Sequence, residues 1–141
     1  MKLAIIVSAL AGGAIQIVDI LQNENFKGLV YIYDDDNRSH SCDILGVPVV
    51  GNISKIQHDF AMGKVDSAII AVGSIEPRER LFNYMKSLGI PITNVISSFA
   101  IISKSAKIGC GNVILPMVYI GPNVIIGDNN YLTTATQINH D

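Results

Sequence analysis

Glycines and acidic side chains follow three apolar runs of this 141-residue chain, where they could bind a phosphorylated ligand. Gly12 and Gly13 follow the first run, the aspartates at 34–36 follow the second, and Gly73 with Ser74 follows the third. Glycine lets backbone N–H groups approach a phosphate, and carboxylates accept hydrogen bonds from a ribose or a base. These residue types indicate a nucleotide site if the three runs are strands of one sheet.

A purely structural role stays open for these features. Gly12 and Gly13 could form only a tight turn from strand to helix, and residues 34–36 could be a solvated acidic turn. The spacing is not G-x-G-x-x-G, so it gives little support for a dinucleotide cofactor. Cys42 and Cys110 lack both C-x-x-C spacing and a neighbouring histidine, so neither a disulfide framework nor a zinc site is expected.

The apolar pattern of the first two thirds predicts alternating strands and helices. Strands are expected at 3–7, 29–33, 67–72 and 92–96, a short extended piece at 46–51, and helices at 14–23, 53–62 and 74–88. This order is typical of a small open parallel sheet with helices on its faces. Because such sheets bind ligands at the carboxyl ends of their strands, the three polar segments would share one edge.

The first apolar run could instead be a targeting segment. Residues 3–11 resemble a short signal peptide with a small-residue cleavage site, and the apolar stretch extends to Leu21, long enough for a membrane span. The run at 3–7 is nevertheless short and rich in β-branched residues, and a second apolar strand follows at βαβ spacing. We therefore expect a cytoplasmic protein without a membrane span.

The composition is that of a folded, weakly charged protein. Ten Lys and Arg against 12 Asp and Glu give a net charge of −2, which argues against a nucleic-acid binder. Charged residues make up 16%, below the typical value of about 25%, and hydrophobic residues make up 49%. Such a chain can build a core, and we expect it to bury surface against another chain as well.

The last third of the chain repeats with a period of six residues. Aliphatic residues stand at 102, 108, 114, 120, 126, 132 and 138. An α-helix cannot explain this spacing, because six residues turn through about 600° and leave one face. The pattern predicts a hexapeptide parallel β-helix whose aliphatic side chains fill the interior, with two coils over 102–137 and a third beginning at Ile138.

Matching segments of a known family are spread over most of the chain. They are the acidic turn at 34–36, the segment 46–51, residues 71–73 with Arg78 downstream, residues 94–96, Ala100, the hexads, and finally His140 with Asp141. Together they resemble the family of sialic-acid O-acetyltransferases and bacterial nucleotide-sugar N-acetyltransferases. The resemblance implies a Rossmann-like α/β domain over 1–98 and the start of a left-handed parallel β-helix over 99–141.

The resemblance also implies an activity and a set of site residues. It implies transfer of an acetyl group from acetyl-CoA to a nucleotide-activated amino sugar or a sialic-acid-like sugar, without a metal. It further implies a homotrimer that holds acetyl-CoA between neighbouring subunits. The residues expected to contact the nucleotide sugar are Ala11, Gly12, Gly13, Asp34, Asp35 and Gly73, and those expected in catalysis are His140 and Asp141.

Acetyl transfer from a thioester to an amine or hydroxyl suits these residue types. The reaction needs a base, which a neutral imidazole can supply, and a carboxylate beside it can orient the ring. No Ser or Cys with a neighbouring base is apparent, so direct attack is favoured over an acyl-enzyme. Without the resemblance, His140 would be interpreted as an exposed polar residue at a β-helix corner, and His40 and His58 are assigned no role.

Two departures from the family pattern qualify these expectations. Gly13 stands where the family's first turn carries a histidine, which puts phosphate contacts there in doubt. Family members continue for several coils beyond the position of His140, so we expect a shortened form with poor acetyltransferase activity. We expect it to self-associate, through stacked coil ends or as a weakened trimer. One competing function is a nucleotide-sugar-binding module with a non-catalytic β-helix. The other is a small-molecule O-acetyltransferase, but that function would leave the acidic turn unexplained.

Overall fold

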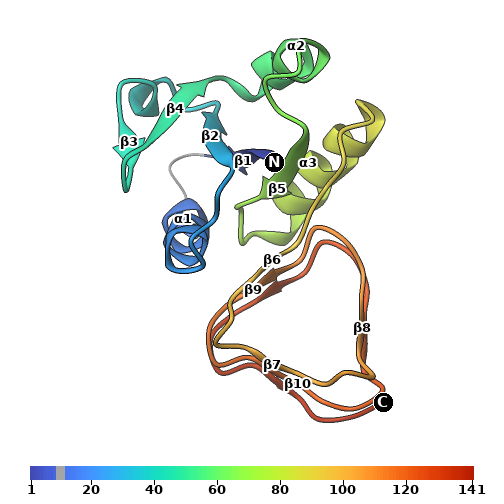
Figure 1. Ribbon diagram of the computed structural model, residues 1–141. Helices are drawn as coiled ribbons and strands as arrows, with labels where there is room; N and C mark the ends of the chain where they lie inside the picture. The colour runs from blue at the N-terminus through green and yellow to red at the C-terminus, as the bar shows by residue number, and fades with distance from the viewer. Residues whose placement is uncertain (9–11) are drawn as a thin grey trace.

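A computed structural model describes residues 1–8 and 12–141 of the chain (Figure 1). In chain order the elements are β1 Lys2–Val7, α1 Gly13–Asn23, β2 Leu29–Asp34, the 3₁₀ turn η1 Asn37–Ser39, β3 Asp43–Ile44, β4 Val47–Gly51, η2 Ile53–Lys55, α2 Ile56–Ala61, β5 Ser67–Ile70, α3 Ile75–Ser87, β6 Val95–Ile96, β7 Ile101–Ile102, β8 Lys107–Ile108, β9 Val113–Ile114, β10 Tyr119–Ile120, β11 Ile125–Ile126, β12 Tyr131–Leu132 and β13 Gln137–Ile138.

The first half of the chain forms a five-stranded sheet in the order β3-β4-β2-β1-β5. Strand β1 lies between β2 and β5 and pairs in parallel with both, so that Ile5 aligns with Ile32 and Ile69. β4 is also parallel to β2, whereas β3 turns back antiparallel to β4 at the edge. The predicted parallel sheet is confirmed, with this short hairpin added.

Helices cover both faces of the sheet. α1 packs Ile17 and Val18 against one face, and α2 and α3 pack Ile56, Leu81 and Met85 against the other. Because β1 is covered on both sides, it is apolar along its length rather than alternating, as expected of a buried parallel strand. None of the helices in the described residues is long and apolar enough to cross a bilayer.

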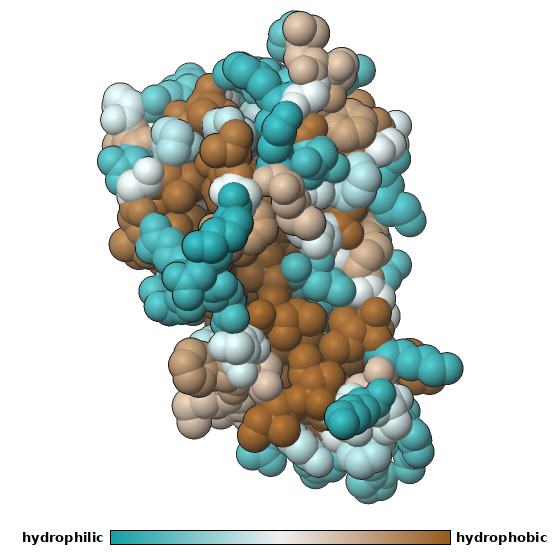
Figure 2. Space-filling model, viewed as in Figure 1, coloured by the Kyte–Doolittle hydropathy of each residue, from teal (hydrophilic) through white to brown (hydrophobic). Residues whose placement is uncertain are grey.

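The second half of the chain winds into triangular coils (Figure 1). Equivalent positions lie 18 residues apart, so Val95 pairs with Val113 and Val113 with Tyr131. Ile114 and Ile120 are fully buried inside the coils, and hydrophobic side chains fill the area that the coils enclose (Figure 2). The fold is therefore an α/β domain followed by the start of a left-handed parallel β-helix, as predicted.

The β-helix takes in a strand that was expected in the open sheet. The predicted strand over 92–96 is confirmed only in part, because Ile92 forms an isolated parallel bridge with Ala68 of β5, whereas β6 pairs with β9 of the β-helix. Ile96 packs with the interior residues and stands one period before Ile102. The six-residue repeat therefore begins at Ile96, one hexad before Ile102, where the sequence pattern placed its start.

The corners of the coils repeatedly use the left-handed backbone region. The residues with positive φ, at 61° to 71°, are Gly111, Met117, Asn123, Asn129 and Ala135. Their spacing of six shows that the fourth position makes the turn in the hexads from residue 108 onward. Glycine and asparagine adopt this conformation readily, whereas Met117 and Ala135 adopt it at a steric cost.

Candidate functional site

A cleft of about 770 Å³ lies between the α/β domain and the β-helix. The carboxyl ends of β1 and β5, the N-terminal ends of α1 and α3 and an outer corner of the β-helix line it. Its walls include Gly12, Gly13, Gly73, Ser74, Tyr131 and Thr133. The sequence-predicted Gly12, Gly13 and Gly73 are thus brought together, whereas Ala11 lies outside the described residues.

Two helix N-termini meet at this cleft. Gly12 precedes α1 and Ser74 precedes α3, and within the described residues neither end is capped by a side-chain hydrogen bond. The first N–H groups of a helix lack partners within the helix and carry the positive end of its dipole. The arrangement can therefore bind an anionic group, and the two ends together suit a diphosphate.

The turn at Gly13 leaves no room for a side chain. A Cβ atom built there would overlap the carbonyl oxygen of Ala71 and lie 3.4 Å from the Tyr131 hydroxyl. The same test at Gly73 finds no atom within 4 Å, so that position faces open space. Gly13 therefore serves as a close-packed turn at the cleft, and a histidine could not replace it without a backbone shift.

Asp34 and Asp35 lie one strand away from the cleft, at the end of β2. Asp34 is 1% exposed, and its Oδ1 accepts a hydrogen bond from the Asp36 amide at 3.0 Å. Asp35 Oδ1 accepts a hydrogen bond from the Ile53 amide at 2.9 Å and faces a second hollow of about 530 Å³, which Arg80 also lines. Neither aspartate is among the described residues that line the large cleft.

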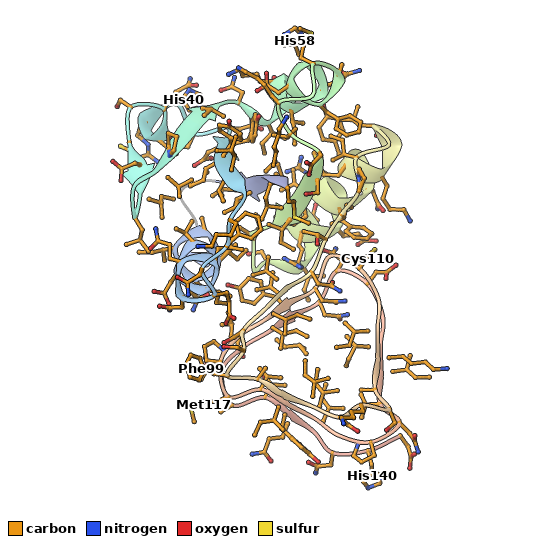
Figure 3. All side chains as sticks on the ribbon, viewed as in Figure 1. His40, His58, Phe99, Cys110, Met117 and His140 are labelled. Atoms are coloured by element: carbon orange, nitrogen blue, oxygen red, sulfur yellow. The ribbon has the colours of Figure 1, made fainter. Side chains whose placement is uncertain are left out.

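His140 and Asp141 form a pair at an outer corner of the β-helix. His140 Nδ1 lies 3.1 Å from Asp141 Oδ2, and both side chains are 74% exposed. The Asp141 amide donates a hydrogen bond to the Pro122 carbonyl in the preceding coil. His140 lies at the corner of the triangular coils away from the α/β domain (Figure 3), so the pair and the cleft are separated within one chain.

Arg78 is a residue of this region to which sequence reasoning gave no role. It is 4% exposed, and burial lowers the pKa of its guanidinium to about 10. Its hydrogen bonds, 2.6 to 3.2 Å long, go to the carbonyl oxygens of Ile70, Val72, Gly111, Asn129 and Asn130. Arg78 therefore joins the end of β5 to two coils of the β-helix.

Tyr131 is a second cleft residue that was missed. The Arg78 guanidinium carbon lies 5.5 Å from the centre of its ring, and its hydroxyl donates a hydrogen bond to Gln16 of α1. Burial raises the pKa of the Tyr131 hydroxyl. The available signal was an aromatic side chain at the sixth hexad position, but Val113, Tyr119 and Ile125 share that position, so it did not single out Tyr131.

Two family models match the chain. Residues 4–85 match the PglD N-terminal domain, and residues 105–134 match the bacterial transferase hexapeptide (six repeats). Comparison with curated proteins found no match.

Solved structures resemble the chain over its whole length. PerB from Caulobacter crescentus in complex with CoA and GDP-perosamine is 25% identical, with a TM-score of 0.87. An alanine mutant of one histidine in the GDP-perosamine N-acetyltransferase of that organism, also with CoA and GDP-perosamine, is 25% identical with a TM-score of 0.88. Each alignment covers 100% of this chain and 64% of the Caulobacter chain, so the present chain spans about two thirds of their length.

A third structure shows the same fold at lower identity. The acetyltransferase domain of PglB from Neisseria gonorrhoeae is 20% identical, with a TM-score of 0.87. The alignment covers 100% of this chain and 66% of that one.

Proposed function

Because this chain belongs to the family defined by the PglD N-terminal domain, we propose that it binds a nucleoside-diphosphate-linked amino sugar and takes part in its acetylation from acetyl-CoA. The observation that carries the proposal is the cleft in which the N-termini of α1 and α3 meet. The Caulobacter structures support it, because they are described as complexes with CoA and GDP-perosamine.

In this proposal the diphosphate lies at the two helix ends. Backbone amides near Gly12, Gly13 and Gly73 bind its oxygens, since in the described residues no side chain caps these helix ends through a hydrogen bond. Ala11 is included on the resemblance alone, because it lies outside the described residues. Asp34 and Asp35 contact the nucleoside, because β2 lies directly beside β1 and its end is the next along the sheet edge.

His140 is the proposed base. Acetyl-CoA supplies the acetyl thioester, and the sugar nitrogen must lose a proton as it forms the new bond to carbon. Since His140 Nδ1 faces Asp141, Nε2 is the nitrogen that takes this proton. The Asp141 carboxylate then stabilises the imidazolium, as in other histidine–carboxylate pairs.

A complete site is proposed to need more than one chain. His140 and the cleft lie apart in a single chain, so the cleft of one subunit would be served by the partner's His140 (Figure 3). An exposed group of hydrophobic side chains on the β-helix supports such an assembly. We call it the apolar corner patch, and it consists of Phe99, Ile101 and Met117, which are 67% to 69% exposed. The proposed assembly is a homotrimer.

Substitution of Gly73 tests the proposal, because a side chain there would enter the cleft without meeting other atoms. We expect Gly73→Leu to remove binding of GDP-perosamine or a UDP-linked 4-amino sugar, measured by calorimetry and thermal shift, and to remove thiol release from acetyl-CoA. Gly127→Leu is the matched control, since Gly127 also has open space around it and lies on the β-helix.

The outcomes separate the competing functions. A Gly73→Leu variant that binds as tightly as the parent would show that the ligand does not use this cleft. Binding of the nucleotide sugar without any thiol release would favour a nucleotide-binding module over an acetyltransferase.

A further inference from the structure

The wall of the cleft that belongs to the β-helix is formed by Tyr131 and Thr133. Tyr131 also lines an adjoining hollow of about 370 Å³, and Gly73 borders both spaces. Tyr131 therefore stands between them, with Gln16 on the cleft side and Arg78 on the other.

The ring of Tyr131 is held from two directions before any ligand is present. Arg78 lies over the ring, and the Tyr131 hydroxyl donates a hydrogen bond to Gln16. These partners come from α3 and α1, so the position of the ring depends on both helices whose N-termini lie at the cleft. A contact surface that is already ordered loses less conformational entropy when a ligand binds.

Arg78 fixes the β-helix against the cleft. Its guanidinium donates to carbonyl oxygens on both sides of the junction, among them Val72 after β5 and Gly111 in the β-helix. Because these groups are buried, losing the guanidinium would leave several carbonyl oxygens without a donor. Arg78 therefore acts on the cleft through the position that it gives to Tyr131.

The order of strands along the sheet edge determines which end of the ligand lies next to the β-helix. Along the carboxyl edge of the sheet, β2 with Asp34 is followed by β1 and then by β5. If the nucleoside lies at β2 and the diphosphate at the ends of α1 and α3, the group beyond the diphosphate reaches the β-helix. In a nucleotide sugar, that group is the sugar.

We propose that Tyr131 is the residue of the cleft that contacts the sugar ring, and that Arg78 and Gln16 are positioning residues which hold it there. This inference rests on the proposed function, since it assumes that a nucleotide sugar occupies the cleft. A sugar presents C–H groups on one face and hydroxyls at its rim. The face and polar tip of a tyrosine suit such a mixed surface.

The test compares a nucleotide with its sugar conjugate on the intact chain. The probes are GDP with GDP-perosamine, and UDP with a UDP-linked 4-amino sugar, measured by calorimetry. We expect Tyr131→Leu to weaken binding of the sugar conjugate about fivefold to tenfold and to change binding of the free nucleotide less than twofold. Tyr131→Phe keeps the ring and should bind the conjugate within about twofold of the parent.

Two further variants distinguish contact from a general effect on the fold. Tyr31→Leu is the matched control, because Tyr31 is also half-buried but packs on the face covered by α2 and α3. Arg78→Lys keeps the positive charge but loses the planar guanidinium with its several donors. It should weaken binding of the sugar conjugate selectively, as Tyr131→Leu does. Melting curves of each variant verify that the chain is folded at the temperature of the titration.

The results separate this inference from the function on which it rests. A parent chain that binds none of the four probes contradicts the proposed function and this inference together. If the parent binds and Tyr131→Leu binds the conjugate equally well, only the inference is wrong. If Tyr131→Leu loses nucleotide and conjugate equally, the inference is also wrong, because the ring then supports the cleft rather than the sugar.

Discussion

Asp34 and Asp35 each bind a backbone amide of a neighbouring turn, and this limits which substitutions are informative. The Asp36 amide donates to Asp34 and the Ile53 amide donates to Asp35. Alanine at both positions would remove the proposed nucleoside contacts and these acceptors together. Asparagine keeps an acceptor oxygen in each side chain and removes only the charge.

We expect Asp34→Asn with Asp35→Asn to weaken nucleotide-sugar binding about tenfold or more, since hydrogen bonds to charged groups contribute roughly 1.5–3 kcal/mol. The double alanine variant should abolish stabilisation by the ligand and also lower the melting temperature. Calorimetry and thermal unfolding measure the two effects. Asp43→Asn is the control, because Asp43 also accepts a backbone hydrogen bond, from Gly46, but lies on the edge strand β3. Parental affinity in the double asparagine variant would exclude the acidic turn from the site.

Replacement of His140 tests the proposed base. In a form extended to the length of the Caulobacter relatives, we expect His140→Ala to lower the rate of acetyl transfer about 10²- to 10⁴-fold, the usual contribution of a positioned general base. Binding of the nucleotide sugar should change little, because the proposed contacts to the nucleoside and the diphosphate come from residues of the α/β domain. Thiol release from acetyl-CoA and calorimetry measure the two quantities. His58→Ala, on the surface of α2, is the control, and an undiminished rate in His140→Ala would remove the imidazole from the mechanism.

Residue types predicted some parts of the site and not others. Gly12, Gly13 and Gly73 were found from the sequence because each follows an apolar run, and strand ends of a parallel sheet share one edge. Arg78 and Tyr131 could not be assigned in this way. The hydrogen bonds that hold Tyr131 at the cleft and Arg78 beside it join residues 115 and 51 positions apart, and no local pattern specifies such pairs.

At the scale of elements, the hexad repeat predicted the β-helix because its signal is periodic and redundant. Each aliphatic position fills the same interior, so the loss of one would not hide the pattern. Residues 92–96 carried no such redundancy. An apolar pair such as Val95–Ile96 fits an open sheet and a coil equally well, and its pairing with β9 decides between them.

The left-handed corners of the coils lead to a prediction about stability. Ala135 has a φ of 68°, where an L-residue with a Cβ atom is strained by roughly 1–2 kcal/mol. We expect Ala135→Gly to raise the free energy of unfolding by about 1 kcal/mol, as measured by denaturant unfolding. Ala106→Gly is the matched control at the fifth hexad position, and it should lower stability because Ala106 packs against the interior and has no positive φ. Equal effects of the two glycines would contradict the role assigned to the corner.

At the scale of the whole molecule, the α/β domain and the β-helix share a core. Val113 and Leu115 of the coils are buried in the same cluster as Ile17 of α1 and Ile5 of β1. Arg78 adds hydrogen bonds across the same junction. The cleft therefore lies beside a buried contact between the two parts, so its β-helix wall is held in place against the α/β domain.

The apolar corner patch leads to a prediction about assembly. Phe99 and Met117 lie together at one corner of the β-helix (Figure 3), and Ile101 aligns with Tyr119 on the adjoining face. Contiguous exposed hydrophobic side chains of this kind are typical of surfaces that another chain covers. We expect the parent chain to self-associate, and Ile101→Lys with Met117→Lys to shift it to monomers in sedimentation velocity.

The double lysine variant should also lose acetyl transfer while it keeps nucleotide-sugar binding, because the cleft belongs to one chain and the proposed base comes from another. Met62→Lys is the control, since Met62 is 68% exposed but follows α2 on the α/β domain. Burying each isoleucine or methionine side chain contributes about 1.5–3 kcal/mol to association. The lysine variant loses this contribution and must also bury unpaired charges, which together would outweigh the association energy of a modest interface. A parent chain that stays monomeric at tens of micromolar and still transfers acetyl groups would show that one chain holds the complete site.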